Sequence, residues 1–77
     1  MHFKIYAGKI GIKTEAAAIK AYLEWHGFSC EYIASAAEHL KLSRGDLKPV
    51  IVLHDGRQFS GFFELQEFLD DEGLRRI

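Results

Sequence analysis

Residues 48–62 have the sequence KPVIVLHDGRQFSGF, and this stretch decides the fold predicted for the 77-residue chain. The apolar run at 50–54 is nearly continuous, which is typical of a strand in the middle of a sheet. Asp55-Gly56 favours a two-residue hairpin loop, so residues 57–60 are expected to form the returning strand. The helical spacing of 62–72 then predicts a β-hairpin followed directly by an amphipathic helix.

Two segments before this hairpin are also expected to be strands. The alternating aromatic and branched residues of 2–7 and 28–33 are typical of half-buried strands. A helical pattern between them predicts a right-handed crossover, which makes the two strands parallel. The predicted element order is therefore β-α-β-α-β-β-α. It corresponds to a mixed four-stranded sheet flanked by helices, in one α/β domain that spans residues 1–77.

The helix ends are predicted from capping residues. Thr14 is expected to be the N-cap of the first helix, after a glycine-containing loop at 8–13. Ser35 and Glu38 match a capping box at the start of the second helix, and Gly45 is expected to end that helix. On the last helix, the residues expected to face inward are Phe62, Leu65, Phe68 and Leu69.

The composition argues against several classes of function. The net charge is −1 and like charges do not form a long run, so no broad basic face for a nucleic acid is expected. No apolar segment has the length of a membrane span, and no signal-peptide pattern follows Met1. Cys30 is the only cysteine, which favours a reducing, cytoplasmic location. The four histidines lack metal-ligand spacing, so no metal site is expected.

The element order and three local features resemble the glutaredoxins, a thioredoxin-fold family, and the glutaredoxin-like redoxins that serve ribonucleotide reductases. The first strand, Lys4-Ile5-Tyr6-Ala7, is similar to the family's opening strand. Residues 48–52 are similar to the segment in which a cis-proline, here Pro49, begins the third strand. Residues 55–62 are similar to the family's hairpin and glycine-marked last helix. The resemblance implies a thioredoxin-like, glutaredoxin-type fold over nearly the whole chain.

The chain departs from this family at the position of the redox cysteines. Counting back from Gly27, the cysteine pair would open the first helix at Lys13-Thr14-Glu15-Ala16. Disulfide exchange needs a thiolate that attacks a sulfur, together with a resolving thiol. None of these four residues has a thiol. We therefore expect no catalytic residue and no dithiol oxidoreductase activity.

Two functions remain open for such a chain. The first is a redox-inactive, small protein-binding or regulatory module, whose partner is another protein. The alternative, implied by the resemblance, is a glutathione-binding thiol-transfer protein or carrier subunit. The backbone beside Pro49 and the carboxylate of Glu64 would then hold the peptide. The candidate ligand- or partner-binding residues, taken from the rim of the family's active site, are Lys13, Thr14, Lys48, Pro49, Ser60, Gly61 and Glu64.

Several of these features also have a purely structural interpretation. Lys13-Thr14 at a helix start is explained either by an anion site or by simple capping. Cys30 alternates with Phe28 and Tyr32, so it is expected to be a small buried hydrophobe. Trp25 lies off the inward stripe of its helix and would contact either a partner or the neighbouring loop. Dimerisation through Trp25 or an exposed sheet edge is a third alternative.

Overall fold

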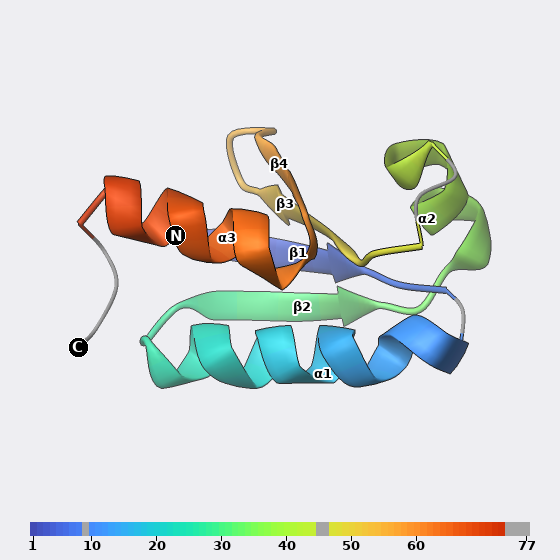
Figure 1. The fold of residues 1–77 in the computed structure, drawn as a ribbon, viewed down its shortest axis with the longest axis horizontal. Coiled ribbons are helices and arrows are strands. Elements are labelled where there is room, and N and C mark those ends of the chain that lie inside the picture. Colours follow the sequence, from blue (N-terminus) through green and yellow to red (C-terminus); the bar gives the residue numbers. More distant parts are fainter. Residues whose placement is uncertain (9, 45–46, 74–77) are drawn as a thin grey trace.

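The computed structural model describes residues 1–8, 10–44 and 47–73, with the backbone alone for residues 10–13. The elements follow in the order β1 (His2–Tyr6), α1 (Ile10–Trp25), β2 (Ser29–Ile33), α2 (Ala36–Ser43), β3 (Val50–Leu53), β4 (Gln58–Ser60) and α3 (Gly61–Asp71). Figure 1 shows α1 running along β2, and α2 at the end of the molecule toward which β1 and β2 point. The expected α/β architecture, with three helices and a mixed four-stranded sheet, is confirmed. Among the described residues, no helix is both long and apolar enough to cross a lipid bilayer.

The sheet has the strand order β2-β1-β3-β4. β1 pairs in parallel with β2 and antiparallel with β3, and β3 pairs antiparallel with β4. Ile5 therefore has Tyr32 and Ile51 as its two cross-strand neighbours. The interior position of β3 agrees with the apolar run that predicted a central strand.

One face of the sheet forms the hydrophobic core together with α1 and α3. Side chains alternate between the faces of a strand, so Phe3 and Ile5 of β1 share the core face with Ile51 and Leu53 of β3. Of the residues predicted to face inward from α3, three are buried and Phe62 is partly buried against the core. The largest buried apolar residues are Phe3, Ile5, Ile19, Leu23, Ile51, Leu53, Leu65, Phe68 and Leu69.

The opposite face of the sheet is covered much less. His2, Lys4 and Tyr6 alternate with the core residues of β1 and are exposed or half-buried. Val52, the cross-strand neighbour of Lys4, also lies on this face and is half-buried. The helix α2 packs against β3, and in Figure 1 it stands at the far end of the sheet rather than over its middle.

The structure corrects the predicted start of the first helix. The helix α1 begins at Ile10, so the predicted loop at 8–13 is mostly helical and Thr14 lies inside the helix with an exposed side chain. A threonine N-cap is preferred by only about 1 kcal/mol. That preference is small enough for tertiary packing to override, because most helical stability in proteins comes from the packing of the apolar face.

The predicted hairpin exists, but its loop has three residues rather than two. The Leu53 and Arg57 backbones pair through a 2.8 Å hydrogen bond, which leaves His54, Asp55 and Gly56 in the loop. Gly56 N donates to Leu53 O at 2.8 Å, and Gly56 has a φ of 95°. A turn followed by one left-handed residue is a common three-residue hairpin connection, and glycine is the residue that tolerates its backbone.

The ends of the second helix agree with its predicted capping. Ser35 is the N-cap of α2, and its hydroxyl accepts a hydrogen bond from Glu38 N at 3.3 Å. Arg44 follows the helix in the left-handed conformation, with a φ of 54°, and its N–H donates to Leu40 O. Gly45, the predicted stop, lies outside the described residues.

Candidate functional site at the start of α3

The start of α3 lies against the segment that precedes β3. Gly61 N donates a hydrogen bond to Pro49 O at 2.8 Å, which joins the first residue of the helix to this segment. Gly61 has a φ of 77°, in the left-handed region that favours glycine. A Cβ added to Gly61 would lie 3.1 Å from Lys48 Cδ and 3.4 Å from Glu15 Oε2. Glycine is therefore needed here both for its backbone conformation and for the close approach of two neighbouring side chains.

The first N–H groups of α3 are bonded to acceptors of the same chain. Phe62 N donates to Glu15 Oε2 at 3.3 Å, across 47 residues of sequence. Ser60 N donates to Glu64 Oε1 at 3.1 Å. Helix starts leave such donors without intrahelical partners and favour negative charge beside them. Glu15 and Glu64 fill that role, so two carboxylates already offset the positive partial charge at the N-terminus of α3.

A buried histidine holds the segment before β3 in place. His39 of α2 is 4% exposed, and its Nε2 lies 2.7 Å from Lys48 O. A carbonyl oxygen only accepts hydrogen bonds, so Nε2 is the donor. Neither the role of His39 nor the tertiary contact of Glu15 was predicted from the sequence. In both cases the partner is distant in sequence, so no local pattern pointed to the contact.

The structure brings five of the seven predicted site residues together. These five and Glu15 form one cluster, which we name the α3 rim and define as Glu15, Lys48, Pro49, Ser60, Gly61 and Glu64. Within it Pro49 and Gly61 are buried, so the side chains that reach solvent are those of Glu15, Lys48, Ser60 and Glu64. Thr14 is exposed on α1 immediately before Glu15. Lys13 belongs to the backbone of α1, and its side chain lies outside the description.

The expected cis-proline is not observed. No cis peptide bond occurs among the described residues, which include Lys48 and Pro49, so the bond between them is trans. Trans is the lower-energy isomer of an X–Pro bond by about 0.5–1 kcal/mol. In this conformation Pro49 O is already oriented toward Gly61 N.

A polar hollow of about 240 Å³ adjoins the α3 rim. Leu42 and Ser43 of α2 form one wall, and Gln58, Ser60 and Glu64 line the other side. Ser43 Oγ is buried and has no hydrogen-bond partner among the described residues. The hollow therefore combines a hydroxyl, an amide and a carboxylate next to two of the predicted site residues.

Two large apolar side chains flank the α3 rim in full view of solvent. Leu47 directly precedes Lys48 and is 58% exposed, and Phe63 of α3 is 72% exposed. Single apolar residues at such exposure are ordinary on a monomer, and a contact surface for a partner is marked by several that adjoin one another. The exposure of Leu47 and Phe63 was not predicted from the sequence, because exposure depends on the tertiary arrangement.

The only cysteine packs against the core, but it is half-buried and not buried as predicted. Cys30 is half-buried in β2 against the core, and its Sγ lies 3.6 Å from Lys20 O. Burial raises the pKa of the Cys30 thiol, and the Glu24 carboxylate adds to the rise. A raised pKa lowers the thiolate fraction at neutral pH and hence the reactivity. Within the described residues, no group of three or more metal-ligating side chains is found.

Comparison with known proteins gives no match to a family model, to a curated protein or to a solved structure.

Proposed function

We propose that the chain is a redox-inactive, thioredoxin-like module of the glutaredoxin type that binds another protein through the α3 rim. The observation that supports this most directly is the contact between Gly61, Pro49 and Glu15 at the start of α3. It joins the start of α3 to the segment before β3, at the place where the resemblance puts the rim of an active site, and the polar side chains of Lys48, Ser60 and Glu64 lie beside it. The sequence has no cysteine pair at the start of α1 with which to perform disulfide exchange.

The topology is consistent with the proposed fold. A parallel pair, β1 and β2, is followed in the sheet by the antiparallel strands β3 and β4, and α3 begins at the end of β4. The trans peptide bond before Pro49 departs from the family's pattern. The proposal therefore rests on the arrangement of the elements and not on that bond.

The partner surface is expected to be apolar at its centre and polar at its edge. Leu47 and Phe63 would insert into the partner, while Lys48 and Glu64 would pair with polar groups around them. Interfaces of this kind derive most of their affinity from a few large side chains. We therefore expect the two apolar residues to contribute more to binding than the charged ones.

Glutathione binding is the alternative, and the geometry makes it less favourable. A γ-glutamyl carboxylate at the start of α3 would compete with Glu15 for Phe62 N–H. It would also lie near the carboxylate of Glu64, which accepts from Ser60 N. Two carboxylates placed close together repel each other. Thiol transfer with glutathione is therefore not what we propose.

The proposal is tested by affinity capture with matched variants. The double variant Leu47→Ser, Phe63→Ser removes the apolar part of the proposed interface, and Leu40→Ser removes an equally exposed leucine from α2. We expect the wild type and Leu40→Ser to retain the same protein partner and the double variant to lose it. Retention of that partner by the double variant would contradict the proposal.

An amide NMR titration with glutathione separates the two functions. The binding module predicts no saturable shifts at millimolar glutathione. A glutathione protein predicts saturable shifts confined to the start of α1, residues 48–50 and residues 60–64. A thiol-transfer assay on a small mixed disulfide supplies the second measurement, for which we expect only background rates.

A further inference from the structure

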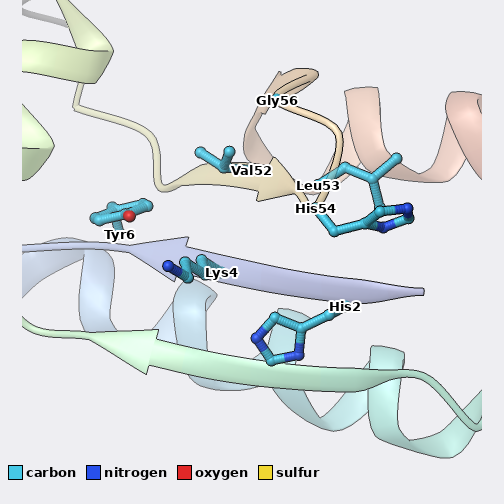
Figure 2. Close-up of a pocket in the computed structure, with 7 residues that line it drawn as sticks. All are labelled: His2, Lys4, Tyr6, Val52, Leu53, His54 and Gly56. Atoms are coloured by element: carbon cyan, nitrogen blue, oxygen red, sulfur yellow. The ribbon is translucent and has the colours of Figure 1, made fainter.

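A second hollow, of about 380 Å³, lies on the sparsely covered face of the sheet. We name it the sheet-face hollow; it is lined mainly by His2, Lys4 and Tyr6 of β1 and by Val52, His54 and Gly56 of β3 and the hairpin loop. Figure 2 shows these side chains along two neighbouring strands, with the amino group of Lys4 between Tyr6 and His2. No residue of a described helix is among its lining residues.

The charged groups around this hollow leave one cation unpaired. Lys4 Nζ has no ion-pair or hydrogen-bond partner among the residues that the structure describes. Glu31, the cross-strand neighbour of Lys4, lies with its carboxylate 3.9 Å from His2 Nε2 instead. His2 Nδ1 also lies 2.9 Å from Ser29 Oγ, which orients the imidazole along the edge of the hollow. The hollow itself has no carboxylate among its lining residues.

The apolar part of the hollow lies beside this cation. Val52 of β3, the cross-strand neighbour of Lys4, and Tyr6, two residues further along β1, are both half-buried. From His2 to Tyr6 the strand β1 spans four residue steps, or roughly 13 Å at about 3.3 Å per residue. This length matches three or four residues of a peptide better than a single small anion.

The shape and the charge narrow the choice of ligand. Small-molecule sites enclose about 70–90% of their ligand, whereas this hollow lies open along the sheet face. Nucleic-acid surfaces need several cations for the phosphates, and among the described residues that line the hollow Lys4 is the only lysine or arginine. β1 and β3 are each paired on both sides, so a ligand in this hollow cannot add a strand there and must be recognised by side chains.

We propose that the sheet-face hollow docks a short acidic segment of a partner protein, in which a carboxylate pairs with Lys4 and an apolar side chain packs on Tyr6 and Val52. This site is separate from the α3 rim, so it adds a second contact surface to the proposed binding module. Glu31 competes with the incoming carboxylate, because it is the cross-strand neighbour of Lys4 on the same face of the sheet.

The test uses a blocked pentapeptide, acetyl-Asp-Leu-Glu-Leu-Asp-amide, and its neutral counterpart with Asn and Gln in place of the acids. Binding is followed by amide NMR shifts on the intact chain. We expect saturable shifts at residues 2–6 and 52–56 with the acidic peptide, weakening as salt is added. The amides of Ser60, Gly61 and Glu64 should stay unmoved, which distinguishes this site from the α3 rim.

Three variants measure the role of charge. Lys4→Glu reverses the charge and should weaken binding of the acidic peptide by about tenfold. Glu31→Gln should strengthen that binding by about two- to fivefold, the range expected of exposed ion pairs. Lys41→Glu makes the same charge change on α2, away from the hollow, and should leave the affinity within about twofold. Lys4 and Glu31 are exposed, so the folded state is expected to tolerate both changes.

Four outcomes would overturn the proposal. Two concern the peptides: the neutral peptide binds as tightly as the acidic one, or the shifts appear at the α3 rim instead of the hollow. The other two concern other occupants: inorganic phosphate or an oligonucleotide binds more tightly at the same amides, or sedimentation shows a second copy of the chain covering this face. An affinity that does not respond to Lys4→Glu would overturn it as well.

Discussion

The α3 rim and the sheet-face hollow both contain polar groups. They differ in whether those groups have hydrogen-bond or ion-pair partners within the chain. At the α3 rim, Glu15, Pro49 and Glu64 satisfy the donors of the helix start from within the chain. In the sheet-face hollow, Lys4 has no such partner among the described residues. A group whose interactions are complete inside the fold contributes to stability. A group whose interactions are incomplete is available for a ligand, so changes in the two regions should affect different measurements.

The largest effect on stability is expected from Gly61→Ala. A left-handed backbone costs a residue with a Cβ about 1–2 kcal/mol, and a Cβ at Gly61 adds a smaller cost because the Lys48 side chain, 3.1 Å away, must shift by a few tenths of an ångström. Gly56→Ala is the matched control, because Gly56 also has a positive φ but open space around its Cβ position. Urea denaturation should show a clearly larger loss for Gly61→Ala. Equal losses would mean that the α3 rim is not tightly packed.

A smaller loss of stability is expected from Glu15→Ala. It removes the acceptor of Phe62 N and should lower the free energy of unfolding by about 1–2 kcal/mol, as the loss of a helix cap does. Glu67→Ala makes the same substitution at an exposed position in the middle of α3 and should change stability by less than about 0.5 kcal/mol. Both values come from urea denaturation. If the two variants have the same free energy of unfolding, the hydrogen bond between Phe62 N and Glu15 does not stabilise the fold.

Lys4→Gln should have almost no effect on stability. Lys4 is exposed and unpaired among the described residues, so we expect a change within about 0.5 kcal/mol. The acidic pentapeptide should nevertheless bind this variant more weakly. A stability loss comparable to that of Glu15→Ala would show that Lys4 is part of the internal network, and the contrast between the two regions would fail.

The smallest effect concerns Asp55, in the loop beside the hollow. The Arg57 backbone N–H, helped by the Arg57 side chain, holds the pKa of the Asp55 carboxyl below its ordinary value. A lowered folded-state pKa contributes stability above the ordinary aspartate pKa, and this contribution is lost as pH falls through the lowered value. Asp55→Asn should therefore narrow the difference in urea midpoint between neutral and acidic pH slightly. If Asp55→Asn leaves the pH dependence of the urea midpoint unchanged, the hydrogen bonds between Asp55 and Arg57 do not contribute to stability.

Much of the fold follows from local patterns in the sequence. The alternation of β1, the apolar run of β3, the Ser35 cap and the inward face of α3 were all predicted, because each depends on residues within one or two turns or strands. Two local predictions failed by small amounts. Thr14 is not a cap and the hairpin loop has three residues, since preferences of about 1 kcal/mol yield to packing.

The candidate site was only partly accessible to the same reasoning. Lys48, Pro49, Ser60, Gly61 and Glu64 were chosen by resemblance, and the structure brings them together. Glu15 was missed because its partner, Phe62 N, lies 47 residues along the chain. His39 was missed because its partner is a backbone oxygen, that of Lys48, which no side-chain pattern indicates.

The sequence by itself determined the order of the strands and helices and which side of each strand is apolar, because periodicity and capping act over a few residues. It also determined that no cysteine pair is present for redox chemistry. Only the tertiary structure decided that Glu15 would reach the start of α3 and that no described helix residue would line the hollow around Lys4. Those outcomes depend on how elements distant in sequence pack, since the burial of the shared core sets their positions.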